Sequence, residues 1–237
     1  MQYWFITGTS SGLGRAIAEA VLQKNDVKVF GFSRHKEITH TNYFHSDIDL
    51  SDPEQVKKII FDECLEAEKI VLINNAGSLG KIDQTKNLDL DTIIRTYQLN
   101  IISPHILISK FIKQYENYIC KKIIINISSG AASSPYDGWS MYCSSKAALN
   151  MLTLCVSKEL ELNNSNIKIL SVAPGVMDTE MQTQIRNVDE GAFSRKNKFV
   201  DLKNNDQLYN AHDVAAKFIE MIDNVSASTE TILKIEL

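Results

Sequence analysis

The stretch Thr7-Gly8-Thr9-Ser10-Ser11-Gly12-Leu13-Gly14 decides the fold, because it joins a short apolar strand to an amphipathic helix. From the apolar patterns we expect the strand at Tyr3–Thr7 and the helix at Leu13–Lys24. A glycine-rich turn in this position gathers free backbone N–H groups and the positive end of a helix dipole at one point. The stretch therefore predicts a pyrophosphate-binding turn, with the spacing GxxxGxG in place of GxGxxG.

Three glycines give this turn its expected chemistry. Gly8 would permit the tight turn, Gly12 would let phosphates approach the backbone, and Gly14 would let the helix pack on the strand. The alternative is an ordinary tight turn that leads into a helix. The strand on one side and the helix on the other favour phosphate binding.

Strands and helices alternate along the rest of the chain. Further strands are expected at Val27–Phe32, Asn42–His45, Ile70–Ile73, Lys122–Ile127, Ile167–Val172 and Thr231–Ile235. Further helices are expected at Pro53–Ala67, Asp91–Tyr115, Ser140–Leu162 and Asp213–Ile222. Strands of continuous β-branched residues are buried on both faces, which is typical of a parallel sheet covered by helices. The pattern predicts an α/β, single-domain Rossmann fold: a doubly wound, seven-stranded parallel sheet with helices on both faces.

Length and composition fit one domain of this kind. The chain has 237 residues, of which 44% are hydrophobic and 23% charged. Neither a repeat nor a linker interrupts it, so we expect residues 1–237 to form one domain. Residues 177–210 show no clear periodicity. Because a long loop in a compact domain is usually functional or mobile, we expect a substrate loop or lid there.

Charge and cysteine spacing exclude several functional classes. The 25 basic and 29 acidic residues give a net charge of −4, which argues against nucleic-acid binding. The sequence has no stretch of about 18 apolar residues, so we expect no membrane span. The N-terminal residues do not resemble a signal peptide. The four cysteines form no metal-binding pattern. We expect a cytoplasmic protein with free thiols, no metal, and no membrane or nucleic-acid partner.

The end of the second expected strand, Gly31-Phe32-Ser33-Arg34, indicates the nucleotide. A carboxylate there would bind an adenosine ribose and repel a 2′-phosphate. Ser33 and Arg34 instead offer a hydroxyl and a guanidinium, which suit a 2′-phosphate. The sequence thus predicts NADP, with NADPH preferred over NADH. The alternative is that Arg34 is an ordinary solvated loop residue.

Tyr142 and Lys146 lie four residues apart near the start of an expected helix, so their side chains share a face. A free phenol titrates at about pH 10, and a fixed cation beside it lowers its pKa. A phenol tuned in this way can give a proton to a developing alkoxide near neutral pH. Ser129, at the end of a buried strand, could hold a carbonyl oxygen beside the phenol. For the pair alone, the alternative is a surface contact.

Pro104 lies inside the long helix expected at 91–115. It has no N–H for the carbonyl of Asn100, four residues earlier. That carbonyl could hold a water that connects the ammonium of Lys146 to solvent and refills the proton donor. The alternative is an incidental kink.

These motifs resemble those of the short-chain dehydrogenase/reductase family. TGTSSGLG at 7–14, NNAG at 74–77, Asn100, Ser129, YCSSK at 142–146 and PG at 174–175 occur in that family's order and spacing. The match spans nearly the whole chain. NISS at 126–129, Gly138-Trp139 and APGVMDTEMQ at 173–182 are similar to the sepiapterin reductase-like branch, including bacterial benzil reductases that form (S)-benzoin.

The resemblance implies a role for each matching residue. Tyr142 would donate the proton, and Ser129 would orient the substrate carbonyl. Lys146 would bind the nicotinamide ribose and lower the phenol pKa, while Asn100 would hold the relay water. The implied cofactor contacts are Gly8, Ser11, Gly12, Leu13 and Gly14 at the pyrophosphate, Asp49 and Leu50 at the adenine, Asn75, Ala76 and Gly77 at the adenine ribose, and Met177 and Thr179, after the Pro174-Gly175 turn, at the carboxamide.

The resemblance also implies hydride transfer from a nicotinamide to a carbonyl carbon. In animal sepiapterin reductases an aspartate in the last strand anchors the pterin, whereas here Leu233 is near that place. We therefore expect a small, aromatic 1,2-dicarbonyl, as in the reduction of benzil to (S)-benzoin. Tyr136, Trp139 and Met181 are expected near the pocket mouth, with ordinary packing as their alternative role.

Two alternative functions stay open. One is a short-chain reductase of another ketone class, such as sepiapterin, a 3-oxoacyl thioester, a quinone or a steroid. The other is a non-catalytic NADP-binding sensor, which the retained Tyr142 and Lys146 argue against. The resemblance further implies a homodimer or homotetramer built on two long helices.

Overall fold

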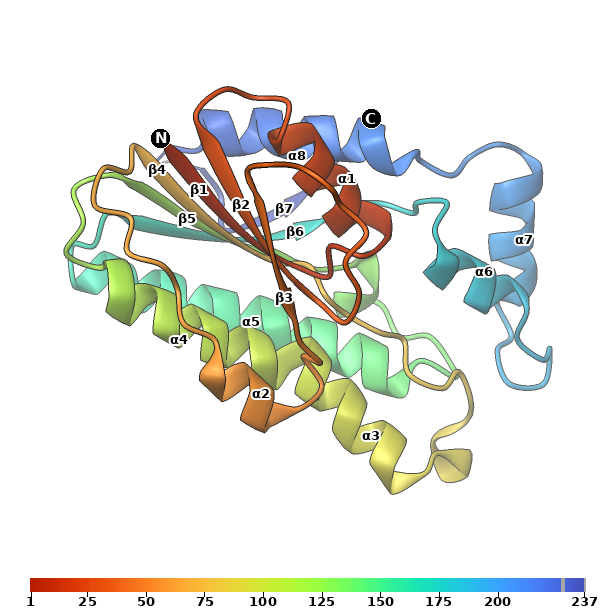
Figure 1. Ribbon diagram of the computed structural model, residues 1–237. Helices are drawn as coiled ribbons and strands as arrows, with labels where there is room; N and C mark the ends of the chain where they lie inside the picture. Colours follow the sequence, from red (N-terminus) through yellow and green to blue (C-terminus); the bar gives the residue numbers. More distant parts are fainter. Residues whose placement is uncertain (227–228, 237) are drawn as a thin grey trace.

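The computed structural model describes residues 1–226 and 229–236, and its centre is a seven-stranded sheet (Figure 1). Its strands are β1 (Gln2–Thr7), β2 (Val27–Ser33), β3 (Tyr43–Asp47), β4 (Lys69–Asn74), β5 (Lys121–Ile127), β6 (Ile167–Ala173) and β7 (Ile232–Lys234). All neighbours pair in parallel, in the order β3-β2-β1-β4-β5-β6-β7. The chain winds outward from β1 in both directions, which is the doubly wound arrangement. The predicted seven-stranded parallel Rossmann fold is confirmed.

Helices cover both faces of this sheet (Figure 1). They are α1 (Gly12–Val21), α2 (Pro53–Lys58), α3 (Leu90–Tyr97), α4 (Ser103–Tyr115), α5 (Ser140–Leu162), α6 (Glu180–Arg186), α7 (Lys196–Asn204) and α8 (Ala211–Asn224). Leu72 and Ile73 are neighbours in β4 that pack on opposite faces: Ile73 joins α1 and α8, and Leu72 joins α2, α4 and α5. Since a fully buried Leu or Ile contributes about 1.5–3 kcal/mol, these two clusters hold the layers together.

Helix α2 is shorter than the sequence predicts. The expected helix over Pro53–Ala67 ends at Lys58, because Ile59 leaves the helical conformation with ψ of 127°. The ammonium of Lys110 on α4 donates to the carbonyl of Ile59 at 2.7 Å, which therefore needs no helical partner. Phe61 is then buried against the sheet from an irregular segment.

The uninterrupted helix predicted at Asp91–Tyr115 is also wrong in detail. A π-helical turn at Gln98–Ile102 separates α3 from α4. The N–H of Ser103 bonds to the carbonyl five residues back rather than four. Pro104 consequently lies in the first turn of α4, a position that proline tolerates. Such turns are frequent at functional sites, and this one carries Asn100.

The segment 177–210, expected to lack regular structure, contains α6 and α7 beyond the carboxyl ends of the strands (Figure 1). Asp178 ties the two helices together, with Lys203 Nζ at 2.6 Å and Arg186 at 3.6 Å. The sequence shows little apolar periodicity here because each helix is short and α7 buries only Phe199.

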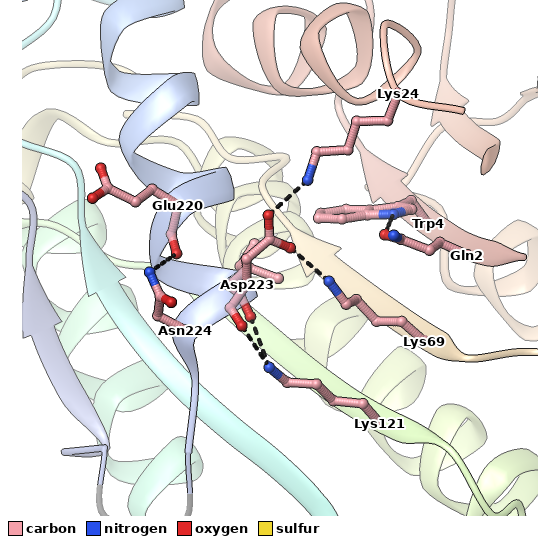
Figure 2. A network of polar contacts seen from close by, with 9 residues as sticks. Gln2, Trp4, Lys24, Lys69, Lys121, Glu220, Asp223 and Asn224 are labelled. Atoms are coloured by element: carbon pink, nitrogen blue, oxygen red, sulfur yellow. Dashed lines mark hydrogen bonds and ion pairs between the residues drawn. The ribbon is translucent and has the colours of Figure 1, made fainter. Parts of the chain in front are cut away.

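A polar network lies at the other end of the sheet, where the strands begin (Figure 2). Asp223, in the last turn of α8, accepts from Lys24 at 2.7 Å and from Lys69 at 2.6 Å. Lys121 donates to the carbonyls of Ile222 (3.3 Å) and Asp223 (2.9 Å), which lie at the negative end of that helix. Burial opposes ionisation of Asp223, but the two lysines hold its pKa below the usual range. The network joins α8, β4, β5 and the segment after α1 where the strands begin.

The cysteines are free thiols, and Cys64 is the buried one. Within residues 1–226 and 229–236, no helix has the length and apolar character that crossing a membrane requires. In the same part of the chain, no three His, Cys, Asp or Glu side chains form a group suited to a metal ion.

Candidate active site

Strand β5 and helix α5 bring three of the expected catalytic side chains together. Ser129 follows the end of β5, and α5 carries Tyr142 and Lys146 on one face, one turn apart. Nζ of Lys146 lies 5.7 Å from the Tyr142 ring centroid, and the Ser129 hydroxyl is near enough to the phenol to lower its pKa. Tyr142 is 7% exposed and Lys146 4% exposed. A substrate oxygen bound here would meet two hydroxyl groups in a largely desolvated site.

Burial governs the protonation of this site. It lowers the pKa of Lys146 to about 8. Burial also raises the pKa of Tyr142, and the hydrogen bond with Ser129 opposes that change without cancelling it. The expected lowering of the phenol pKa by Lys146 is therefore not seen in the protein alone. The physical reason is that desolvation disfavours both the phenolate and the ammonium.

Asn100 is fixed by the π-helical turn. Its Oδ1 accepts from the N–H of Ser78 at 2.9 Å, and its Nδ2 donates to the Ser78 carbonyl at 2.8 Å and to Ser145 Oγ at 3.0 Å. A Cβ built on Gly77 would lie 3.4 Å from both Asn100 Oδ1 and Lys146 Nζ, so the three residues border one space. The side chain of Asn100 thus shapes the site, and the water-holding role of its carbonyl stays a prediction.

The phosphate turn has the expected conformation. Gly8 and Gly12 have φ of 72° and 55°, a region that favours glycine. Gly14 packs directly on the Gly8 carbonyl, and the preceding residue, Leu13, has its side chain buried. Ser11 is the N-cap of α1 but makes no side-chain bond to it, which leaves the first N–H groups for a ligand.

The segment Asn75–Gly77 is bonded to the same turn. Thr7 Oγ1 accepts from the N–H groups of Asn75 and Ala76, both at 2.9 Å. Asn75 Nδ2 donates to the Thr7 carbonyl at 2.9 Å. The residues expected at the pyrophosphate and at the adenine ribose are therefore held in one rigid unit.

The residues expected at the adenosine lie at the ends of β2 and β3. Ser33 Oγ donates to the His35 carbonyl at 2.9 Å, so its only proton is already engaged. Arg34 is exposed beside it. Asp49 Oδ1 accepts from the N–H and hydroxyl of Ser51, and the Leu50 carbonyl accepts from the Ser103 hydroxyl. Of the two residues expected at a 2′-phosphate, only Arg34 thus offers donors to a ligand.

The turn after β6 brings Met177 and Thr179 to the phosphate turn. Pro174 leads into Gly175, whose φ of 82° and close approach to the Tyr209 ring leave no room for a side chain. Met177 then pairs with Tyr209 in a parallel bridge. A cleft of about 410 Å³ runs between Gly12, Thr179 and their neighbours. The two predicted cofactor-binding segments therefore face each other across a cleft.

Aromatic side chains form a wall beside Tyr142. Trp139 meets the Tyr142 ring edge-on at 5.7 Å between centroids and stacks on Tyr136 at 5.0 Å. The sequence did not single out Phe193 and Phe199, whose ring centroids lie 4.9 Å and 5.3 Å from that of Trp139. Met181, Cys143 and Ile185 pack on the same cluster. The expected pocket residues are thus assembled, together with two rings from the 177–210 segment.

Gln182 is a further residue that the sequence did not single out. It is 2% exposed, and its Nε2 has no hydrogen-bond partner. The local sequence of α6 is mostly polar and does not predict a buried glutamine. The burial of Gln182 is evident only from the packing of the helix.

Comparison with known proteins agrees with this geometry. A family model described as short chain dehydrogenase matches residues 2–190. The chain belongs to the short-chain dehydrogenase family. It is 37% identical over 230 residues to benzil reductase ((S)-benzoin forming) of Bacillus subtilis (strain 168), covering 94% of each protein. It is 34% identical to the benzil reductase of the same description from Bacillus cereus, with all of both chains covered.

A solved structure gives the same result. The KRED1-Pglu enzyme superposes with a TM-score of 0.86 at 30% identity, covering 98% of this chain and 100% of that one. The resemblance to the short-chain dehydrogenase/reductases, and within them to benzil reductases, is confirmed. The chain is an oxidoreductase of CH–OH and C=O groups with a nicotinamide cofactor.

The residues present fit such a cofactor. The unsatisfied N–H groups at the start of α1 and the glycine at position 12 suit the pyrophosphate. The space bordered by Gly77, Asn100 and Lys146 suits the nicotinamide ribose, since it offers an ammonium beside the phenol. The cofactor carries the redox chemistry, while the protein binds, orients and polarises.

Proposed function

We propose that the chain is an NADPH-dependent carbonyl reductase that transfers a hydride to one ketone of a small, aromatic 1,2-dicarbonyl, as in benzil to (S)-benzoin. The observation that carries the proposal is the proximity of Ser129 to Tyr142, beside the aromatic wall of Trp139. Flat aryl groups stack on such a wall. The similarity to two benzil reductases supports the same substrate class.

The chain's own residues then have distinct roles. A bound nicotinamide supplies the hydride to the carbonyl carbon. Ser129 donates a hydrogen bond to the ketone oxygen, and Tyr142 gives that oxygen its proton as negative charge develops on it. Lys146 holds the nicotinamide ribose and places a positive charge beside the phenol. The side chain of Asn100 keeps the π-helical turn in place. Its main-chain carbonyl holds a relay water that returns the proton to Tyr142.

NADPH is preferred because of Arg34. A guanidinium can bind a 2′-phosphate with two parallel hydrogen bonds, and no carboxylate stands at the end of β2 to repel it. Because the hydroxyl proton of Ser33 is already donated to the His35 carbonyl, the 2′-phosphate would be bound mainly by Arg34.

The assembly proposed is a homodimer or homotetramer in the cytoplasm. Four apolar side chains are between 42% and 64% exposed. They are Ile94 on α3, Ile102 in the π-helical turn, and Met151 and Leu154 on α5. Apolar side chains in such numbers favour a partner surface. Residues 177–210 form the lid over the small-molecule substrate, inside one NADP-binding domain.

The test is NADPH oxidation against a panel of benzil, 1-phenyl-1,2-propanedione, sepiapterin and an acetoacetyl thioester, with chiral analysis of the products. We expect the highest kcat/KM with the two diketones and the (S)-alcohol from benzil. A higher kcat/KM with sepiapterin or the thioester would assign the chain to another ketone class instead.

A further inference from the structure

Two buried N–H donors near the aromatic wall have no hydrogen-bond partner: Nε2 of Gln182 and Nε1 of Trp139. Gln182 is 2% exposed and Trp139 is 5% exposed. Most buried polar groups in native proteins are paired, and an unpaired donor destabilises the fold. Two such donors in one region therefore indicate a ligand with an acceptor.

The amide of Gln182 has a defined orientation. Its Oε1 accepts from the guanidinium of Arg186 at 3.1 Å, one turn further along α6. A guanidinium only donates, so it selects the amide oxygen and leaves Nε2 as the unpaired end. Arg186 is itself held by Thr183 at 3.0 Å and Asp178 at 3.6 Å. The amide oxygen is thus engaged, and the donor end of the amide stays buried and unpaired.

Helix α6 places this donor on the face that contributes to the aromatic cluster. Gln182 and Ile185 are the buried residues of α6 and, three residues apart, they share a face. Ile185 belongs to the apolar cluster that contains Trp139 and Tyr142. Gln182 consequently lies on the face of α6 that carries Ile185, a member of the cluster that contains Trp139 and Tyr142.

We propose that Nε2 of Gln182 binds the second carbonyl oxygen of a 1,2-dicarbonyl substrate. The inference rests on the proposed function, in which the oxygen under reduction is bound by Ser129 and Tyr142. A vicinal diketone has a further acceptor on the adjacent carbon, and a simple aryl ketone has none. A site built to donate to an oxygen rejects an analogue that lacks it, because the donor then stays buried and unpaired. Gln182 is thus the specificity-determining residue for dicarbonyls.

The test compares wild type and Gln182→Met on 1-phenyl-1,2-propanedione and on propiophenone, in which a methylene replaces the second carbonyl. Propiophenone is followed both as a substrate and as a competitive inhibitor, with NADPH as cofactor. We expect kcat/KM for the diketone to fall by about 10- to 100-fold, because methionine has the same length but no N–H. The kcat/KM and inhibition constant for propiophenone should stay unchanged.

Gln184→Met is the matched control. Gln184 lies on the same helix, is exposed, and already donates to the Gly80 carbonyl at 3.1 Å. This variant should keep the wild-type preference for the diketone. A merely structural role of Gln182 would instead lower Tm and reduce kcat/KM for both ketones alike.

The outcomes separate this inference from the proposed function. If Gln182→Met keeps the wild-type preference, or if Trp139→Phe abolishes the preference while Gln182→Met does not, the assignment to Gln182 is overturned and the reductase activity stands. If the wild type reduces no 1,2-diketone, the proposed function fails and the inference with it. Should the methionine variant not fold, Gln182→Leu also removes the N–H groups without adding a charge and gives the same comparison.

Discussion

Lys146 Nζ donates to the main-chain carbonyl of Ile127 at 2.7 Å, at the point where β5 ends. The bond fixes the ammonium beside Tyr142. Burial lowers the pKa of Lys146 to about 8, so a charge at neutral pH is held there against its desolvation cost. Keeping this cation next to Tyr142 thus lowers the stability of the folded chain.

Replacing this lysine should therefore stabilise the chain while removing activity. At pH 7 we expect Lys146→Met to raise the free energy of unfolding by about 1–3 kcal/mol. The folded-state pKa of about 8 lies below the ordinary 10.5, so the unfolded chain binds more protons between these values. Wild-type stability then rises with pH across that window, and the advantage of the variant shrinks. Urea unfolding at neutral and alkaline pH measures both effects.

Lys158→Met is the matched control for this prediction. Lys158 lies on the same helix, but its side chain is 63% exposed and pairs with Glu161. Its replacement should leave the stability at pH 7 nearly unchanged, as expected for an exposed ion pair. If Lys146→Met were less stable than wild type at pH 7, desolvation would not be the dominant effect.

Gly14→Ala should damage the phosphate turn. A Cβ at this position would collide with the Gly8 carbonyl and with Nδ2 of Asn75, although alanine otherwise favours a helix. We expect a loss of about 1–3 kcal/mol in stability, as for other overpacking changes, and weaker NADPH binding. Thermal unfolding and NADPH fluorescence measure the two effects. A Cβ on Gly191 meets nothing within 4 Å, so Gly191→Ala should change neither.

Arg34→Ala should change the cofactor preference. Loss of a charge-assisted contact with the 2′-phosphate is expected to raise KM for NADPH by about 10- to 100-fold. KM for NADH should not change, since that cofactor has no 2′-phosphate. Arg95→Ala, at an exposed position on α3, is the control and should affect neither cofactor. An equal effect of Arg34→Ala on both cofactors would leave the preference unexplained.

Sequence reasoning predicted the sheet well, because its central strands are continuous apolar runs. The strand expected at Ile70–Ile73 is observed at Lys69–Asn74, and the one expected at Val27–Phe32 ends one residue later. It failed where tertiary contacts override the local pattern. The capping of Ile59 by Lys110, more than fifty residues away in sequence, ends α2 early and leaves no local trace.

In the candidate site, too, the sequence predicted what local periodicity determines and failed where tertiary packing decides. The spacing of Tyr142 and Lys146 and the position of Ser129 predicted their proximity, because helix periodicity and strand ends determine it. The direction of the phenol pKa could not be predicted, since it depends on how deeply the ring is buried. The unpaired amide of Gln182 depends on the packing of a short helix whose buried face carries one polar and one apolar residue.

The central claim is that Tyr142 is the proton donor of a carbonyl reductase. The most direct measurement is the turnover of 1-phenyl-1,2-propanedione with NADPH by wild type and Tyr142→Phe, alongside the NADPH dissociation constant. Phenylalanine keeps the ring that meets Trp139 and removes only the hydroxyl. We predict that kcat falls by about 10²- to 10⁴-fold while the NADPH dissociation constant is unchanged. A variant that binds NADPH normally and keeps most of the wild-type kcat would contradict the account.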